Sequence, residues 1–276
     1  MIGRRTVLGA IGGGGLLASV AARAGSASIA EPKPAQARMR TFMLMRGALD
    51  DRLVIGSLNG RYWGCVNGAM TPLFDVVSAT FSRYRRLADG SYRGVSIEQA
   101  YFVDRETGEW LRSFDNPYTG KTVKVPTGGY PPTSVVFGTD LVMRVAKPLP
   151  GMTLTHSMSP LMTQGDNVMM TEVTSVGAVG KPPSYHGIVG LHARAGEIDR
   201  AGAKKVRCET SYTSVSRWPM WLEMSDHPGE TVAAGQGSYG TTLDDLPKTW
   251  VAAARQHRPE LLSDPARLLE PLWREG

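Results

Sequence analysis

Two histidines, His186 and His192, have the side chains and the proximity in sequence that a metal site would require. They lie six residues apart on the same face of a predicted strand, so at about 3.3 Å per residue they are separated by roughly 20 Å. Two ligands of one metal cannot lie so far apart, because metal–nitrogen bonds are about 2 Å long. Only a sharp bend at Gly187 or Gly190 would bring the rings together, and we therefore predict no metal site.

His156 is the better candidate for chemistry, as a general base. It stands in a loop predicted over residues 147–165, beside strands that would hold such a loop rigidly. A general base needs a partner that orients it, and the candidate partners are Asp140 and Asp166. The alternative is a surface histidine, or one that is hydrogen-bonded locally.

Large apolar side chains form a second candidate site, a ligand cavity inside a barrel. Trp218 and Met220 share one face of a predicted strand, and Phe137 and Met143 share one face of another. With Tyr101 they would line a cavity if the sheet closes on itself. The 13 methionines of the chain suit such a surface, because Met adapts to irregular gaps. The alternative is a barrel that these side chains fill completely.

Other catalytic and cofactor motifs are missing from the sequence. It contains no GxSxG nucleophile motif and no CxxC pair. Gly235, Gly237 and Gly240 follow no strand–turn–helix pattern, so a nucleotide site is not expected. We predict no cofactor.

The elements that would position these residues are mostly strands. Short apolar runs alternate with turn signals every 8 to 15 residues or so, which is typical of an antiparallel sandwich or barrel. The Asn-Gly pairs at 59–60 and 67–68 predict hairpin turns. The expected strands include residues 41–48, 52–58, 61–66, 82–87, 92–103, 134–146, 168–179, 185–194 and 210–224, and the expected helices cover 243–256 and 265–273. The helices would cover one end of the barrel. The prediction is a mainly β, antiparallel, lipocalin-like β-barrel with short C-terminal helices.

The first 30 residues have the pattern of a twin-arginine export signal. Arg4 and Arg5 directly precede an apolar run that is too short and too weakly apolar for a membrane span. We expect a signal over 1–30, a linker over 31–39 and a single barrel domain over 40–276. The expected partner during export is the twin-arginine translocase, and the expected location is the periplasm or the exterior. No stable membrane span is predicted.

The charge of the chain excludes nucleic acid as an expected partner. Of the 31 basic residues, three lie in the predicted signal, which leaves 28 against 25 acidic residues. Nucleic-acid binding calls for a basic patch or stripe, which this balance does not suggest.

Cys65 and Cys208 are the two cysteines of the chain. An oxidising compartment would permit a disulfide between them if their Cα atoms lie within about 7 Å. Two buried free thiols are the alternative.

Several short motifs lie along the β part of the chain, and residues 218–222 and 228–229 form two less distinct ones. They are Arg46-Gly47, residues 72–75 and 89–92, residues 104–108, and the turn Asn116-Pro117-Tyr118-Thr119-Gly120 with Val123 and Val125. In these motifs the chain resembles, from about Met39 to Pro265, a family catalogued as domain of unknown function 1838. Members of that family carry a polar stretch with His and Asn-Asp-Pro after this turn, whereas residues 126–132 read Pro-Thr-Gly-Gly-Tyr-Pro-Pro here. The resemblance implies a fold type and supplies no activity.

The expected function is binding or processing of a small, largely apolar or aromatic molecule inside the barrel. As an enzyme, the protein would be an isomerase, hydratase or hydrolase that uses His156 with a carboxylate. A non-catalytic carrier or sensor with the same cavity is one alternative. An envelope interaction protein with a solid barrel is the other.

Overall fold

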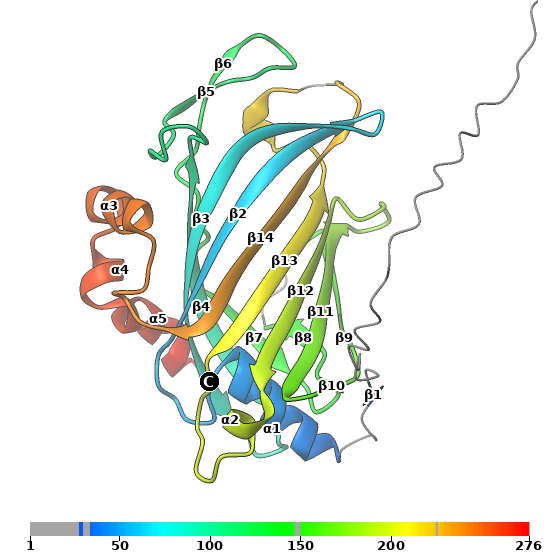
Figure 1. Cartoon of the computed structure of the whole chain (residues 1–276), viewed down its shortest axis with the longest axis vertical. Helices are drawn as coiled ribbons and strands as arrows, with labels where there is room; N and C mark the ends of the chain where they lie inside the picture. Colours follow the sequence, from blue (N-terminus) through cyan, green and yellow to red (C-terminus); the bar gives the residue numbers. More distant parts are fainter. Residues whose placement is uncertain (1–27, 30–33, 147–149, 225, 276) are drawn as a thin grey trace, which may run out of the picture.

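Ten strands of the chain form a nearly closed, antiparallel, barrel-like sheet, and short helices follow at the C-terminal end. The computed structural model describes residues 28–29, 34–146, 150–224 and 226–275. The predicted fold class is confirmed (Figure 1). Of the predicted signal over 1–30, only Ser28 and Ile29 are described, as strand β1, and Arg4 and Arg5 lie outside the described residues. None of the helices in the described ranges combines the length and apolar character needed to cross a membrane.

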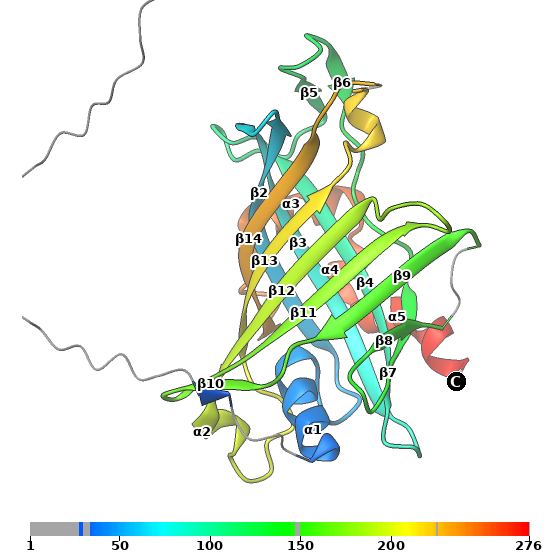
Figure 2. The same cartoon turned by 90° about the vertical axis from the view of Figure 1, so that its right-hand side faces the viewer.

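The sheet that forms the barrel has twelve described strands, including the very short β1 and β10, and they follow a mostly sequential order. The long strands are β2 (Val54–Val66), β3 (Ala69–Arg86), β4 (Tyr92–Val103), β11 (Asn167–Ala178), β12 (Tyr185–Arg194), β13 (Cys208–Ser216) and β14 (Glu230–Thr241). The short ones are β1 (Ser28–Ile29), β7 (Thr133–Phe137), β8 (Met143–Val145), β9 (Met152–Met158) and β10 (Met162–Gln164). They are hydrogen-bonded in the order β1-β10-β11-β12-β13-β14-β2-β3-β4-β7-β8, and β9 also pairs with β11. Figure 2 shows β9, β11, β12 and β13 side by side.

Two contacts bring distant parts of the chain together around the barrel. β2 pairs along its length with β14, so residues near 60 lie beside residues near 235. At the other side, no ladder joins β8 to β9 in the described chain, although the backbone N–H of Met143 on β8 donates to Nδ1 of His156 on β9 at 3.0 Å. We call this junction the seam. It is the place where the barrel is incompletely closed.

Helix α1 (Ala35–Arg46) fills the lower end of the barrel, where a linker followed by a strand over 41–48 was expected. Figures 1 and 2 both show it across that end. The prediction was wrong because four consecutive side chains, Phe42 to Met45, are all buried. A helix that is buried on all sides has no apolar stripe to mark it as a helix. The ring of Phe42 meets Phe137 from β7 with centroids 5.1 Å apart.

The C-terminal helices α3 (Lys248–His257), α4 (Glu260–Ser263) and α5 (Pro265–Arg274) confirm the predicted helical segments in kind. They pack on the outer face of β3 and β4, and not over an end of the barrel as expected (Figure 1). Phe81 and Ile97 on the strands contact Trp250 from α3 in this outer core. The Trp250 indole N–H donates to the Gln99 carbonyl at 2.8 Å and fixes α3 on β4.

The upper end of the barrel is covered by an aromatic cluster. The hairpin of β5 (Ser113–Asp115) and β6 (Thr122–Lys124) and the short 3-10 helix η1 (Met220–Leu222) lie over this end. Phe74 packs between Phe102, Phe114 and Trp221, with ring centroids 4.9 to 5.3 Å apart. The barrel interior is therefore bounded by α1 below and by this cluster above.

Several predicted strand boundaries were wrong. Residues 134–146 form two strands joined by a turn, and 210–224 ends as a strand at Ser216. The predicted turn at 59–60 lies inside β2, whereas Asn67 and Gly68 do form a hairpin turn, with φ of +52 and +80. An ideal Cβ on Gly60 would lie 2.8 Å from the Ala234 carbonyl oxygen, so this glycine permits close approach of β14 and not a reversal.

Candidate functional site

The strand register places a mixed polar and apolar surface inside the barrel. Side chains alternate between the two faces of each strand, and the residues that contact α1 define the inner face. On β11 this face carries Glu172, and on β9 it carries His156. In the register of the two strands, Glu172 lies opposite Met158 and His156 lies opposite Thr174. From α1, Arg46 reaches the same level. These three residues form the floor of the upper interior.

Arg46 and Glu172 form a largely buried ion pair. The Arg46 Nε donates to Glu172 Oε2 at 3.3 Å, and the two side chains are only 18% and 7% exposed. A second guanidinium N–H donates to the Tyr84 hydroxyl at 3.2 Å, and the guanidinium lies 4.3 Å from the ring centre of Tyr239. Burial would raise the pKa of Glu172, but the Arg46 charge and the hydrogen bond from His156 outweigh it and hold that pKa below its usual value. The pair is therefore ionised in the folded protein.

His156 lies in strand β9 and not in a loop as predicted, and both of its ring nitrogens are engaged. Nδ1 accepts the Met143 N–H, so the proton of the neutral ring belongs on Nε2. Nε2 faces Glu172 Oε1 at 3.4 Å. The side chain is 0% exposed. His156 thus holds the seam together on one side and the Glu172 carboxylate on the other, and presents no free nitrogen to the interior.

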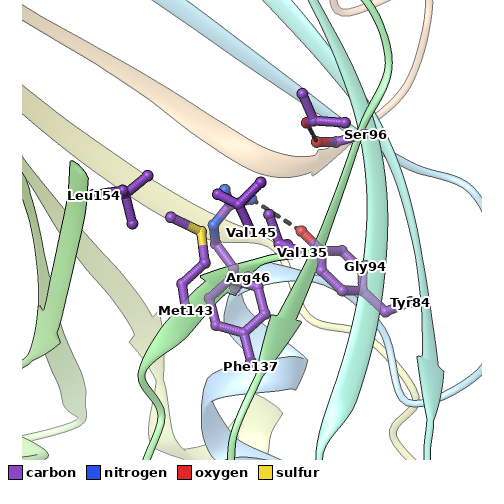
Figure 3. A pocket seen from close by; sticks show the side chains of 10 residues that line it. Arg46, Tyr84, Gly94, Ser96, Val135, Phe137, Met143, Val145 and Leu154 are labelled. Atoms are coloured by element: carbon purple, nitrogen blue, oxygen red, sulfur yellow. Dashed lines mark hydrogen bonds between the residues drawn. The ribbon is translucent and has the colours of Figure 1, made fainter. Parts of the chain in front are cut away.

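A pocket of about 240 Å³ lies above this floor, beside the seam (Figure 3). Its walls are mainly apolar side chains from β7, β8 and β9, namely Val135, Phe137, Met143, Val145 and Leu154. Figure 3 shows Arg46 between these residues and Tyr84. Ser96 and Thr133 add hydroxyls whose oxygens are 3.4 Å apart. The pocket combines apolar walls with one guanidinium.

The structure brings some of the predicted site residues together and separates others. Phe137 and Met143 line the pocket. Trp218 lies at the upper end, where its ring is 5.2 Å from that of Tyr118, and Met220 is 96% exposed. Tyr101 faces the C-terminal helices outside the barrel, 4.8 Å from the Trp110 ring. Of the residues predicted to line a cavity, only those on β7 and β8 line this pocket, and residues 218–220 are not in a strand.

The carboxylate that faces His156 is Glu172, and neither of the two expected aspartates. Asp140 sits in an exposed turn and pairs with Arg144 at 2.6 Å. Asp166 is at another turn, where it accepts the Gly196 N–H at 3.3 Å. Both carboxylates serve local turns. No group of three or more His, Cys, Asp or Glu side chains in the described ranges is arranged to hold a metal ion.

Cys65 and Cys208 are free thiols, so the disulfide is not formed. Cys208 pairs in register with Tyr239, which pairs with Gly56, nine residues from Cys65 along β2. At about 3.3 Å per residue the two cysteines lie roughly 30 Å apart along the barrel. Burial raises the pKa of the Cys208 thiol to about 12. This thiol is therefore protonated and inert.

Arg46 was missed as a site residue, although one signal pointed to it. The motif Arg46-Gly47 stood among the residues of the family resemblance, without an explanation. A Cβ on Gly47 would lie 2.5 Å from the Tyr84 ring, so only glycine lets that ring reach the end of α1. The glycine thereby places the Tyr84 hydroxyl on the guanidinium. Glu172 carried no comparable signal.

A family model matches most of the chain. The family model described as "Protein of unknown function (DUF1838)" matches residues 54–271, which include every strand of the barrel except β1. No curated protein matches the chain.

Proposed function

Because the chain belongs to the DUF1838 family, whose description assigns no activity, we propose a function from the barrel interior: the protein binds a small, largely apolar molecule. The observation that carries this proposal is the pocket of about 240 Å³ with apolar walls and Arg46 at its floor. A water molecule occupies about 30 Å³, so the pocket accommodates a ligand of roughly eight non-hydrogen atoms, or part of a longer one.

The chemistry of Arg46 restricts the polar end of the ligand. A guanidinium donates hydrogen bonds and accepts none, so the group that meets it must be an acceptor such as a carboxylate or carbonyl oxygen. Two of its N–H groups donate to Glu172 and Tyr84, and Arg46 also lines the pocket. Apolar walls with a few placed polar groups are typical of small-molecule sites.

Binding without catalysis is favoured by the state of His156. A general base needs a nitrogen within reach of the proton it removes. Both nitrogens of His156 have partners within the protein, and the ring is enclosed. The isomerase, hydratase and hydrolase hypotheses all require His156 as a general base, which its contacts do not allow. We therefore propose that the protein is a non-catalytic carrier or sensor.

Calorimetric titration with octanoate tests this proposal. Val145→Phe places a ring in the pocket, and we expect octanoate to bind at least tenfold more weakly to it than to the wild type. Val173→Phe is the matched control, because Val173 is 37% exposed on β11, whose inner face carries Glu172. Absence of octanoate binding to the wild type, or equal weakening in both variants, would contradict the proposal and favour an interaction protein with a solid barrel.

We further propose that the protein works in the periplasm or outside the cell after twin-arginine export. Support comes from the sequence, in which Arg4 and Arg5 precede the apolar run. A ligand carrier that folds before export is compatible with this route.

A further inference from the structure

A second carboxylate faces the barrel interior without a basic partner. Glu98 stands on the inner face of β4, two residues beyond Ser96 and so about 7 Å farther up the strand. One of its oxygens accepts the Ser78 hydroxyl at 2.7 Å. No Lys or Arg in the described ranges forms an ion pair with it, in contrast to Glu172. The Glu98 side chain is also exposed, although it points inward.

Tyrosine side chains from other strands lie close enough to this carboxylate to interact with its charge. They are Tyr62 from β2 and Tyr185 from β12, and the Tyr185 hydroxyl lies 3.2 Å from that of Tyr212 on β13. Tyr185 lies over Gly187, where a Cβ would be 2.3 Å from its hydroxyl. Burial, with Glu98 and the other tyrosines as smaller causes, raises the pKa of Tyr62 and of Tyr185. These hydroxyls stay neutral, and they leave the Glu98 charge uncompensated.

Above the floor, the Glu98 carboxylate therefore has no ion-pair partner among the described residues. Arg46 and Glu172 compensate each other at the floor. Glu98 adds one negative charge to a chamber whose other polar groups here are hydroxyls. We propose that this chamber is a binding site for a small organic cation, an alkylammonium or arylammonium group.

An ammonium group fits the chamber for three chemical reasons. It carries three donors and no acceptor, and Glu98 and the tyrosine hydroxyls offer acceptor oxygens. Its charge is compensated by the carboxylate through a charge-assisted hydrogen bond. Aromatic rings attract cations in addition. A divalent metal ion fits less well, because Ca²⁺ takes six to eight oxygen ligands and usually several carboxylates.

The test is calorimetric titration of the full chain with hexylammonium, with 1-hexanol as the uncharged probe of the same length. The main variant is Glu98→Gln, which keeps the shape and removes the charge. Glu230→Gln is the matched control, because Glu230 is an exposed acidic residue at the start of β14. Circular dichroism checks that each variant keeps its fold, and Tyr212→Phe serves as a second chamber variant.

We expect saturable hexylammonium binding that Glu98→Gln weakens by about tenfold or more, with Glu230→Gln and hexanol binding unchanged. Weakening in Tyr212→Phe would support the chamber independently. Failure of hexylammonium to bind the wild type, or equal binding to Glu98→Gln, would overturn the proposal. Glu98 does not line the pocket beside the seam, so Val145→Phe should leave hexylammonium binding intact and Glu98→Gln should leave octanoate binding intact.

Discussion

Replacing Glu172 by Gln should destabilise the fold strongly, because it leaves the Arg46 charge without its partner. The two groups are 3.3 Å apart, with exposed fractions of only 18% and 7%, so water screens them little. Two charges about 4 Å apart attract by about 4 kcal/mol at an effective dielectric constant of 20. Removing one partner of a buried pair costs about 3–5 kcal/mol. In a domain of this size that loss lowers Tm by roughly 6–20 °C.

The assay is denaturation in urea, with an exposed ion pair as the control. Glu209 pairs with Arg207 at 2.9 Å, but their side chains are 64% and 56% exposed. Glu209→Gln should therefore change the free energy of unfolding by about 1 kcal/mol or less. Replacing both Arg46 and Glu172 by Met should cost less than the sum of the two single changes, because neither charge is then left alone.

The pH dependence of the free energy of unfolding provides an independent check that the Glu172 carboxylate stabilises the fold. Since the folded protein lowers the pKa of Glu172, its carboxylate stabilises the fold above the unfolded value of about 4.3. This stability is lost as the pH falls below that value through the folded pKa. The difference between wild type and Glu172→Gln should therefore shrink below about pH 4. A loss in Glu172→Gln no larger than in Glu209→Gln, or a difference that grows in acid, would refute the reasoning.

Three further predictions concern other parts of the chain. His156→Phe should expose the Met143 amide to hydrogen exchange and destabilise the fold by about 1–3 kcal/mol, and unchanged protection of that amide would show that the seam does not depend on the histidine. An aromatic disulfide reagent should label Cys65 in the native protein and Cys208 only after unfolding, since Cys208 is buried with a pKa of about 12; rapid native labelling of both would contradict this. Changing Arg4 and Arg5 to Lys should leave the precursor in the cytoplasm of an exporting host, as a cell-fraction immunoblot would reveal, and normal export would exclude the twin-arginine route.

The fold class could be predicted because turn signals and apolar alternation report directly on antiparallel strands. The alternation fails in β14, which carries Ala233, Gly235 and Gly237 on its inner face and was missed. Small residues give no apolar period, yet they let β14 approach β2 closely, and an ideal Cβ on Gly235 would lie 2.5 Å from the Asn59 carbonyl oxygen. The Asn-Gly pair at 59–60 was misinterpreted for the same reason.

The candidate site was only partly predictable, because its parts come from distant segments. His156 could be singled out by its residue type, but its partners are set by strand register. Glu172 lies diagonally across from it on β11, and Arg46 comes from a helix more than a hundred residues earlier. No local spacing links these positions. The inward direction of Glu98 likewise follows from which face of β4 the C-terminal helices cover.

The pairing of β2 with β14 has a consequence for biosynthesis. Val54–Val66 emerges early from the ribosome, but its partner Glu230–Thr241 is among the last segments to be made. Until then one edge of β2 presents unpaired backbone groups, which are prone to pair with other chains. The nascent chain therefore cannot complete its barrel during elongation, and ribosome-associated chaperones should bind it until synthesis ends. A premature stop codon before residue 230 would yield a product that aggregates, and not a smaller working barrel.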